Sequence, residues 1–318
     1  MRGIFFDPYI MKKNLIVILG PTASGKTAMA ARLAAEFGGE IISADSRQVY
    51  RGMDIGTGKD LEEFRIDGRV IPCHLIDILD PDQEFNVFEF QKRFYEIFSA
   101  LREKQVLPLL VGGTGLYLES VLTHYFMPNA ETDERMREEL AGLTMEELQD
   151  ILLAMKPQLH NQTDLHDRER LIRKIEIERA RQNSSNHSDP FPQIHAGVFG
   201  VFWERAELKK RISTRLHIRL AEGMIEEVSR LHDEGVSWER LERFGLEYRF
   251  IARYLQKKMT REEMAAGLQT AIGQFAKRQM TWFRRMEKKG VSIEWIPGGD
   301  YSALHSRVLQ MLSRDVLP

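Results

Sequence analysis

The stretch with the clearest chemical potential lies near the start of the chain and reads Gly20-Pro21-Thr22-Ala23-Ser24-Gly25-Lys26-Thr27. It follows an apolar run at residues 15–19 and precedes strong helix formers at residues 28–33, which is the setting of a phosphate-binding loop. Backbone N–H groups and a helix N-terminus make a concave anion site there, and the lysine adds a positive charge. We therefore expect residues 20–27, the phosphate loop, to bind a diphosphate or triphosphate, and the loop alone leaves open which one.

A second group that could do chemistry is Asp45, which follows the short apolar segment at residues 40–44. Ligands of parallel sheets bind outside the carboxyl ends of the strands. Asp45 is therefore expected to lie beside the phosphate loop, with its carboxylate available to a ligand. The alternative is a structural role as the N-cap of a helix.

A third apolar segment, at residues 106–111, ends in Gly112, Gly113 and Thr114. A nucleotide hydrolase or kinase often has an acidic residue at such a strand end to hold Mg²⁺. Glycines instead allow a close backbone approach, and the threonine supplies a hydroxyl. This pattern disfavours ATP chemistry in the phosphate loop.

Arginines recur at every fourth position, at Arg211, Arg215 and Arg219. This spacing places them on one face of a helix, where like charges repel each other unless an anion faces them. Two interpretations stay open at this point. The arginines face a bound anion, or they are solvated or paired with acids distant in the sequence.

The elements that must position these groups form an α/β pattern. A strand, a helix and a second strand within about thirty residues predict a βαβ unit and a parallel sheet. Further strands are predicted at residues 106–111 and 198–203, with helices at 88–103 and 264–289. Between them, three polar helices are predicted at residues 132–141, 145–155 and 167–181. We expect a catalytic core at residues 11–127 plus 196–318, interrupted by an all-helical insertion domain at residues 128–195.

Composition narrows the class of protein. A single cysteine, Cys73, excludes a disulfide framework and a cysteine-based zinc site and fits a reducing compartment. Residues 201–290 hold 20 Lys and Arg against 13 Asp and Glu, although the net charge of the whole chain is −2. Such an asymmetry is typical of local polyanion binding, with solvated helix faces as the alternative.

The N-terminal segment at residues 1–10 is apolar but short, and Asp7 and Pro8 interrupt it. It lacks the pattern of a signal peptide, and Met11 is an alternative start. The sequence has no run of eighteen apolar residues, so no membrane span is predicted. We expect a cytoplasmic protein that acts as a monomer.

Taken together, four blocks of the sequence resemble bacterial tRNA dimethylallyltransferases, also called tRNA isopentenyltransferases, of the IPP transferase family. They run in order from about residue 14 to 285: the phosphate loop, residues 45–57 (DSRQVYRGMDIGT), residues 111–117 (VGGTGLY) and residues 276–282 (AKRQMTW). Many families share the first block, whereas the second is highly specific.

The resemblance implies a P-loop NTPase-like parallel sheet flanked by helices, with an all-helical insertion. It implies transfer of a dimethylallyl group from dimethylallyl diphosphate to N6 of adenosine 37, beside the tRNA anticodon, with Mg²⁺ and without ATP. It makes Thr22 a donor to the bridging oxygen of the diphosphate. Under this hypothesis Asp45 is the general base, Arg215 neutralises the leaving group, and Thr27 holds Mg²⁺.

By resemblance, RNA contacts are expected at Asp45, Ser46, Arg47, Gln48, Thr114, Arg135, Glu169, Arg170, Leu171, Ile172, Arg173, Arg243, Phe244, Gly245, Leu246, Glu247 and Tyr248. The chain departs from the family at Ile272-Gly273, where a Thr-Arg pair is usual, so an arginine expected near the diphosphate is missing. Three alternatives are a P-loop small-molecule kinase, an adenylate isopentenyltransferase that acts on free nucleotides, and a non-catalytic RNA-binding module. The basic second half and the insertion favour tRNA.

Overall fold

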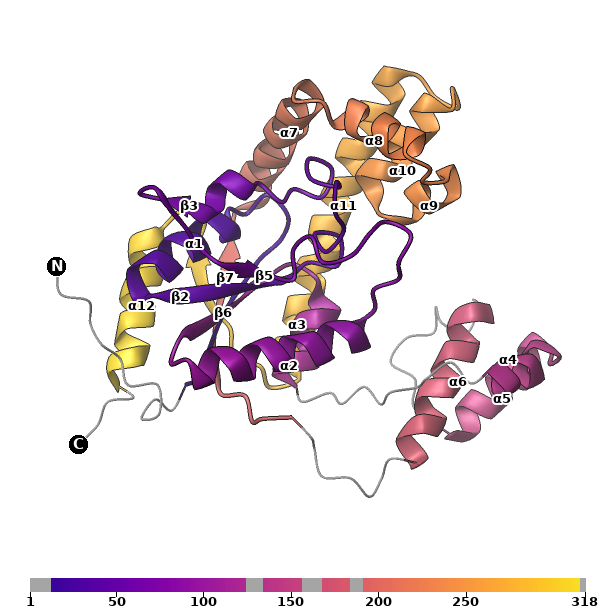
Figure 1. Ribbon diagram of the computed structural model, residues 1–318, viewed down its shortest axis with the longest axis horizontal. Coiled ribbons are helices and arrows are strands. Elements are labelled where there is room, and N and C mark those ends of the chain that lie inside the picture. Colours follow the sequence, from indigo (N-terminus) through magenta and orange to yellow (C-terminus); the bar gives the residue numbers. More distant parts are fainter. Residues whose placement is uncertain (1–12, 124–133, 156–167, 184–190, 315–318) are drawn as a thin grey trace. The chain divides into compact units, whose positions relative to one another are not determined.

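The computed structural model describes residues 13–123, 134–155, 168–183 and 191–314. The chain divides into two compact units (Figure 1). The core unit comprises Met1–His124 and Gln193–Pro318, and the helical unit comprises Tyr125–Pro192. The helical unit starts and ends three residues earlier than the insertion proposed from the sequence. The segment at residues 1–10 lies outside the described residues.

The core unit is built on six parallel strands in the order β5-β2-β6-β1-β7-β8. Their bounds are β1 (Leu15–Leu19), β2 (Gly39–Ala44), β5 (Cys73–His74), β6 (Leu107–Gly112), β7 (Ala196–Phe202) and β8 (Glu294–Pro297). Every residue of β1 is at most 1% exposed, because helices cover both faces of the sheet and a central strand is then apolar throughout. The predicted α/β class with a parallel sheet is confirmed.

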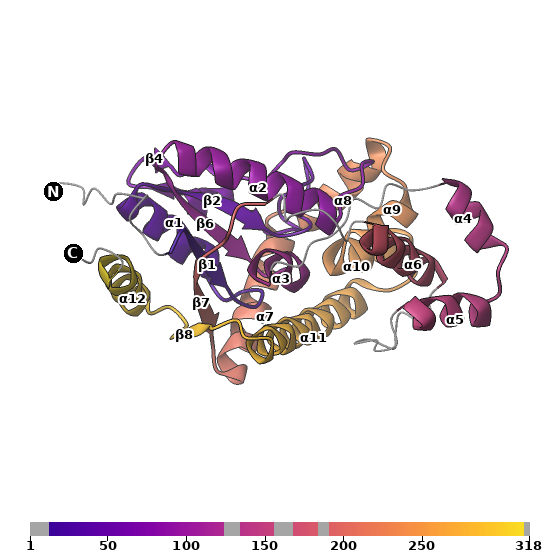
Figure 2. The ribbon, with the colours of Figure 1, turned by 90° about the horizontal axis from the view of Figure 1, so that it is seen from below.

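Four helices cover the sheet. α1 (Lys26–Phe37) and α12 (Tyr301–Arg314) pack on one face, where Leu33 and Leu304 share a buried cluster with Ile16 of β1. α2 (Val87–Glu103) and α3 (Gly115–Leu122) pack together on the other face (Figure 2). Residues 51–84 contain a 3₁₀ turn, η1 (Leu61–Phe64), and a hairpin of β3 (Arg65–Ile66) and β4 (Arg69–Val70).

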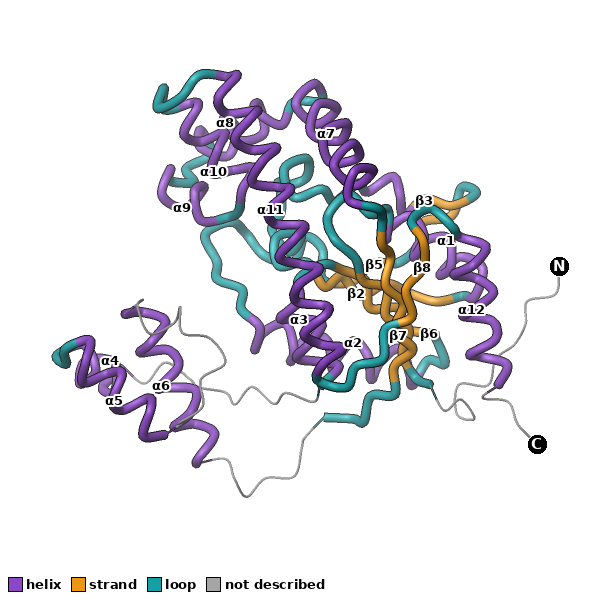
Figure 3. The backbone as a smooth tube through the Cα atoms, turned by 180° about the vertical axis from the view of Figure 1, so that it is seen from behind, coloured by secondary structure: helices purple, strands orange, loops and turns teal. Residues whose placement is uncertain are grey.

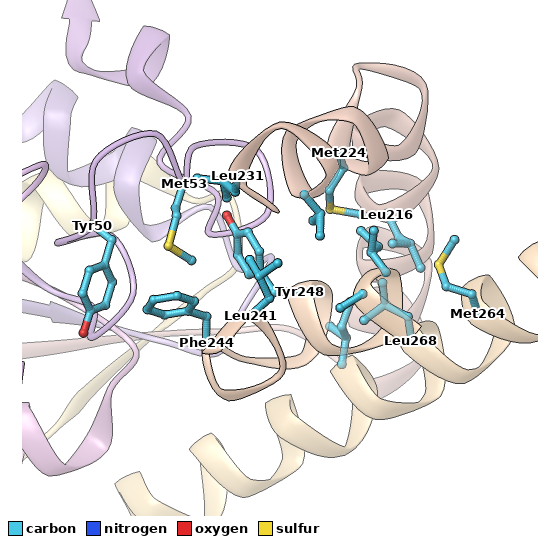
Figure 4. Packing of buried hydrophobic residues seen from close by; sticks show 14 of the residues in the cluster. Tyr50, Met53, Leu216, Met224, Leu231, Leu241, Phe244, Tyr248, Met264 and Leu268 are labelled. Atoms are coloured by element: carbon cyan, nitrogen blue, oxygen red, sulfur yellow. The ribbon is translucent and has the colours of Figure 1, made fainter. Parts of the chain in front are cut away.

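Five further helices form a layer beside the carboxyl ends of the strands: α7 (Arg205–Ala221), α8 (Met224–Asp233), α9 (Trp238–Arg243), α10 (Leu246–Leu255) and α11 (Arg261–Lys288). The long helix α11 runs past α3, α7 and α10 (Figure 3). It begins three residues before the predicted start because Thr260 and Glu263 form a capping box, which satisfies N–H groups that the first turn leaves unpaired. Figure 4 shows the core of this layer, in which Leu216, Met264 and Leu268 are buried.

The loop after Asp45 is fixed against this helical layer by Glu227 of α8. The buried carboxylate of Glu227 accepts hydrogen bonds from the backbone N–H groups of Asp54 (2.8 Å), Ile55 (2.7 Å) and Gly56 (3.0 Å). It also accepts one from the hydroxyl of Tyr248 at 2.7 Å. A Cβ atom on Gly56 would lie 2.7 Å from the Tyr248 ring, so this position requires glycine.

A buried lysine holds the same loop from within. Lys59 is 0% exposed and donates to the carbonyl of Tyr50 at 2.7 Å and to the carboxylate of Asp54 at 2.6 Å. It also donates to Asp77. A buried charge is tolerated only when it is paired and hydrogen-bonded. The specific sequence run at residues 45–57 therefore belongs to a rigid loop whose shape depends on these contacts.

The helical unit has its own small core. α4 (Glu134–Ala141), α5 (Met145–Met155) and α6 (Arg168–Asn183) enclose Leu140, Leu148, Leu152, Leu171 and Ile175. The buried Glu176 accepts from Arg137 at 2.7 Å and from Arg173 at 2.8 Å. The three helices predicted here are found, each within about two residues of its predicted bounds.

Within the described ranges, no helix is both long and apolar enough to cross a membrane. The expected cytoplasmic location and monomeric state stay predictions.

The contacts of Glu227 predict a large effect on stability. In Glu227→Ala, three backbone N–H groups and one hydroxyl lose their acceptor, and we expect the free energy of unfolding to fall by about 2–4 kcal/mol. Glu226→Ala is the matched control, because Glu226 is exposed in the same helical turn and should cost less than about 1 kcal/mol. Equal effects in urea denaturation would contradict this assignment.

Candidate active site

A cavity of about 560 Å³ opens at the carboxyl ends of β1, β2 and β6. The phosphate loop forms one wall and Asp45 another. Residues of α7, of α11 and of the loop at residues 57–63 complete the lining. The chemistry-bearing stretches found in the sequence therefore meet in one place, as the rule for parallel sheets predicts.

Two carbonyl groups of the phosphate loop accept hydrogen bonds from side chains outside the loop. Ala23 (φ 62°) and Gly25 (φ 82°) adopt the left-handed conformation, which alternates the direction of successive peptide groups. Arg211 donates from Nε to the carbonyl of Ala23 at 2.8 Å, and Trp203 donates from Nε1 to the carbonyl of Ser24 at 2.9 Å. With these carbonyls bound outside, the N–H groups at the start of α1, which lack partners within the helix, are left for an anion.

Gln279 of α11 ties the loop to the neighbouring strand end. Its Oε1 accepts from the Thr22 N–H at 2.8 Å, and its Nε2 donates to the Gly113 carbonyl at 2.9 Å. Gln279 is 7% exposed, so both halves of its amide have protein partners. A Cβ on Gly113 would lie 2.4 Å from Nε2 of Gln279, which explains the need for glycine at this strand end.

Lys26 and Arg215 carry positive charge into the cavity. Burial, and next the charge of Arg215, lower the pKa of Lys26 to about 8. Burial, and next the charge of Arg219, lower the pKa of Arg215 to about 10. Neither side chain has a carboxylate within ion-pair distance in the part of the chain that the structure describes. A bound polyanion would relieve the repulsion between them.

The arginines of α7 have three different partners. Arg211 bonds to the phosphate loop and stacks on Trp203, with 4.4 Å between its guanidinium carbon and the ring centroid. Arg215 donates to the hydroxyl of Thr22. Arg219 is buried and pairs with Asp60 at 2.8 Å. The two interpretations left open by the sequence are thus both represented, because Arg219 is paired with a distant acid while Arg211 and Arg215 face the cavity.

Asp45 is held at the edge of the cavity by its own turn. Its Oδ1 accepts from the Arg47 N–H at 2.9 Å, and no hydrogen bond to Oδ2 is found within the described residues. Arg47 pairs with Glu247 at 2.7 Å; although burial opposes it, Glu247 and Asp45 raise the pKa of Arg47. Asp45 does not cap a helix, so one carboxylate oxygen remains available to a ligand.

Thr114 and Gln48 lock the same turn to the sheet. The Ser46 N–H donates to Oγ1 of Thr114 at 3.2 Å, and Nε2 of Gln48 donates to the Gly58 carbonyl at 2.9 Å. Oε1 of Gln48 accepts from the Ser43 hydroxyl at 3.0 Å. These bonds fix the direction of the Asp45 side chain relative to the phosphate loop.

Several side chains expected to contact RNA have packing roles instead. Leu171 and Tyr248 are fully buried, and Phe244 and Glu247 are 7% and 6% exposed. Family resemblance indicates a segment but not the direction of its side chains, and the RNA contacts expected of these residues stay predictions. Arg243 and Glu169 are exposed, while the side chains of Arg135 and Arg170 lie outside the described part.

At residues 272 and 273, no side chain takes the place of the missing arginine. Ile272 is buried in the helical layer, and Gly273 is exposed with no atom near the place where a Cβ would lie. The hydrogen bonds made by Gln279, Trp203 and Glu227 could not be predicted from the sequence alone. Only Gln279 had an indication of importance, because it lies inside the AKRQMTW block.

Thr27 fits a metal role only together with a ligand. It lines the cavity, and no group of three or more His, Cys, Asp and Glu side chains in the described ranges could hold an ion. Mg²⁺ commonly binds through one or two protein oxygens plus substrate phosphates and waters. The residues present are compatible with that arrangement.

The lowered pKa of Lys26 predicts proton uptake on anion binding. A bound diphosphate stabilises the protonated amine, so inorganic pyrophosphate should bind with uptake of part of a proton at about pH 8.5, and its affinity should fall as pH rises further. Calorimetry in buffers of different ionisation enthalpy measures this uptake. Lys26→Met should remove it, whereas Lys209→Met, an exposed lysine of α7, should retain it; equal uptake in wild type and Lys26→Met would refute the assignment.

Comparison with known proteins agrees with this geometry. The family model described as IPP transferase matches residues 48–286, and that described as isopentenyl transferase matches residues 13–70. The chain is 56% identical to tRNA dimethylallyltransferase 1 of Syntrophus aciditrophicus, over 94% of this chain and 98% of that protein. It is 54% identical to tRNA dimethylallyltransferase 2 of Pelobacter propionicus, over 90% of both.

Solved structures show the same architecture. A tRNA isopentenylpyrophosphate transferase from Bacillus halodurans is 33% identical, with a TM-score of 0.69 over 95% of this chain and 98% of that one. A eukaryotic dimethylallyltransferase acting on tRNA has a TM-score of 0.76 over 94% of this chain and 77% of that one, and at 22% identity it supports the fold alone. From the family match and these identities, the chain belongs to the IPP transferase family.

Proposed function

We propose that this protein transfers a dimethylallyl group from dimethylallyl diphosphate to N6 of adenosine 37 in tRNA, giving N6-dimethylallyladenosine and diphosphate. One observation carries the proposal. In a member of the IPP transferase family, Asp45 and the phosphate loop line the same cavity as Arg215, which donates to the Thr22 hydroxyl. A carboxylate beside an anion cradle is what transfer from a diphosphate to an amine requires.

The first half of the reaction is departure of the diphosphate. The allylic C1–O bond breaks, and its electron pair stays on the bridging oxygen. Thr22 would donate a hydrogen bond to this oxygen, while Arg215 and Lys26 neutralise the developing charge. Such preorganised donors act strongly where water is excluded. Bonded to Thr22, Arg215 supports both the hydroxyl and the leaving group.

The second half is attack by the acceptor amine. The N6 lone pair is delocalised into the adenine ring, so the amine is a weak nucleophile and must lose a proton as the N6–C1 bond forms. The proton would pass to Oδ2 of Asp45, the oxygen without a protein partner among the described residues. General-base catalysis of this kind contributes about 10²–10⁴ in rate.

The hydroxyl of Thr27, at the N-terminus of α1, would hold Mg²⁺ once the donor is bound, because this helix end favours the anionic diphosphate. When bound, the ion would supply further neutralisation of the leaving group.

The acceptor would be an unpaired base of the anticodon loop, since such a base leaves its stack at low cost. For RNA contact we propose the turn at residues 45–48, Thr114, the exposed Arg243 and the helical unit. We also propose that the backbone near Gly245 and Leu246 contacts RNA, and that Ile172 does so as part of α6. Exposed cations of α11, Lys277 and Arg278, would add phosphate contacts.

The decisive assay offers labelled dimethylallyl diphosphate with unmodified tRNA, with AMP as the competing acceptor and ATP as the competing donor. Transfer to tRNA alone, at the adenine beside the anticodon, is expected. Transfer to AMP would favour an adenylate isopentenyltransferase, and phosphate transfer from ATP would favour a kinase. RNA binding without any transfer would indicate a non-catalytic RNA-binding module.

Asp45→Asn tests the proposed base. The amide keeps an acceptor for the Arg47 N–H but cannot take a proton, so we expect kcat to fall about 10²–10⁴-fold, with donor and tRNA affinities near those of the wild type. Asp67→Asn, in the exposed turn between β3 and β4, is the matched control. A near-normal kcat in single-turnover assays would exclude Asp45 as the base.

A further inference from the structure

We propose that Arg211 binds the terminal phosphate of the donor, so that α7 presents Arg215 to one phosphate of the diphosphate and Arg211 to the other. This inference rests on the proposed function and adds to it how the protein recognises the donor's second phosphate. Its starting point is the position of Arg211, whose guanidinium lies at the phosphate loop and lines the cavity.

The guanidinium of Arg211 is fixed by two uncharged contacts. Its Nε donates to the Ala23 carbonyl at 2.8 Å, and its face lies over the Trp203 ring. Trp203 is fixed in turn by the bond from Nε1 to the Ser24 carbonyl. Arginine stacks well on aromatic faces and keeps its remaining N–H groups for planar oxyanions. The two contacts use only Nε and one face, which leaves the terminal nitrogens available.

The direction of the terminal nitrogens is set by Gly25. A Cβ atom on this glycine would lie 3.4 Å from NH2 of Arg211, so the guanidinium sits against the backbone at the start of α1. The N–H groups of that first turn have no helical partners. An anion bound by them would come within reach of Arg211.

The charge of Arg211 is also uncompensated. Arg219, two turns along the same helix, pairs with Asp60, whereas no carboxylate lies within ion-pair distance of Arg211 in the described ranges. Glu207, one turn earlier, lies 3.8 Å from Lys210 instead. A cation that is rigidly held and lacks an acidic partner suits an anionic ligand.

The spacing on α7 matches a ligand with two phosphates. Residues four apart on a helix are separated by about 6 Å along its axis, and Arg215 contacts Thr22 while Arg211 lies over Gly25. Arg215 therefore reaches the loop at Thr22, whereas the terminal nitrogens of Arg211 lie nearer Gly25 and the start of α1. Under the proposed function the C1–O bond breaks at Thr22, so Arg211 would address the phosphate farther from carbon.

This arrangement would make the donor site selective for diphosphates over monophosphates. Arg215, Thr22 and Lys26 can all act on the phosphate attached to carbon, which both ligands have. Arg211 is useful only when a second phosphate is present. A structural brace for the loop would instead affect both classes of ligand alike, and this difference separates the two roles.

The test compares binding of dimethylallyl diphosphate and dimethylallyl monophosphate to the full chain by calorimetry. In Arg211→Met we expect diphosphate affinity to fall at least about tenfold, as for loss of a charge-assisted hydrogen bond, with monophosphate affinity nearly unchanged. Donor KM should rise more than kcat falls. Arg211→Lys keeps the charge and should retain part of the preference; Lys209→Met, exposed on the same helix, should match the wild type.

The outcomes separate this inference from the function on which it rests. An unchanged preference for the diphosphate in Arg211→Met would overturn it, and so would equal weakening of both ligands, which would indicate a brace. Trp203→Phe provides a second variant: it keeps a stacking face for Arg211 but loses the bond to the Ser24 carbonyl, so it should keep part of the preference, and complete loss of the preference would contradict the role of stacking. A wild type that binds inorganic pyrophosphate but transfers nothing to tRNA would refute the proposed function while leaving the comparison at Arg211 readable.

Discussion

Lys26 and Arg215 are held close enough to repel each other beside the phosphate loop. Burial, and next the charge of Arg215, lower the pKa of Lys26, while burial, and next the charge of Arg219, lower that of Arg215. Neither has a carboxylate partner within ion-pair distance among the described residues. Keeping both charged in the free protein costs stability, and a bound diphosphate removes that cost. Catalysis by differential charge stabilisation depends on such preorganisation, and the remaining contacts of the site serve to maintain it.

Those contacts come from elements far apart in the chain. Gln279 of α11 joins the Thr22 N–H to the end of β6, and Trp203 after β7 bonds to the Ser24 carbonyl. The turn that carries Asp45 continues into a loop fixed by Glu227 and Lys59, which makes the position of the proposed base as rigid as that of the cradle. Donor and acceptor halves of the site thus depend on separate supports, one on α11 and β7 and the other on α8.

Sequence analysis succeeded where the physical signal is local. The phosphate loop, Asp45 at a strand end and the parallel sheet follow from apolar runs, glycines and helix formers that are neighbours in sequence. The roles of Gln279 and Glu227 could not be predicted, since their partners lie 257 and 173 residues away. Nor could spacing alone separate Arg219, which an acid neutralises, from Arg215, which faces the cavity. For Leu171 and Tyr248, family resemblance indicated a segment, and only packing showed that the side chains point inward.

Burial, and next repulsion by Arg215, make the charge of Lys26 costly in the free site, and a bound diphosphate would remove this cost. The most direct measurement is the free energy of unfolding of Lys26→Met at neutral pH, with and without inorganic pyrophosphate. Lys26→Met is expected to be more stable than the wild type without ligand, by about 1–3 kcal/mol given 1.36 kcal/mol per pKa unit. Pyrophosphate is expected to stabilise the wild type far more than the variant. A variant that is less stable without ligand, or equally stabilised by pyrophosphate, would contradict it.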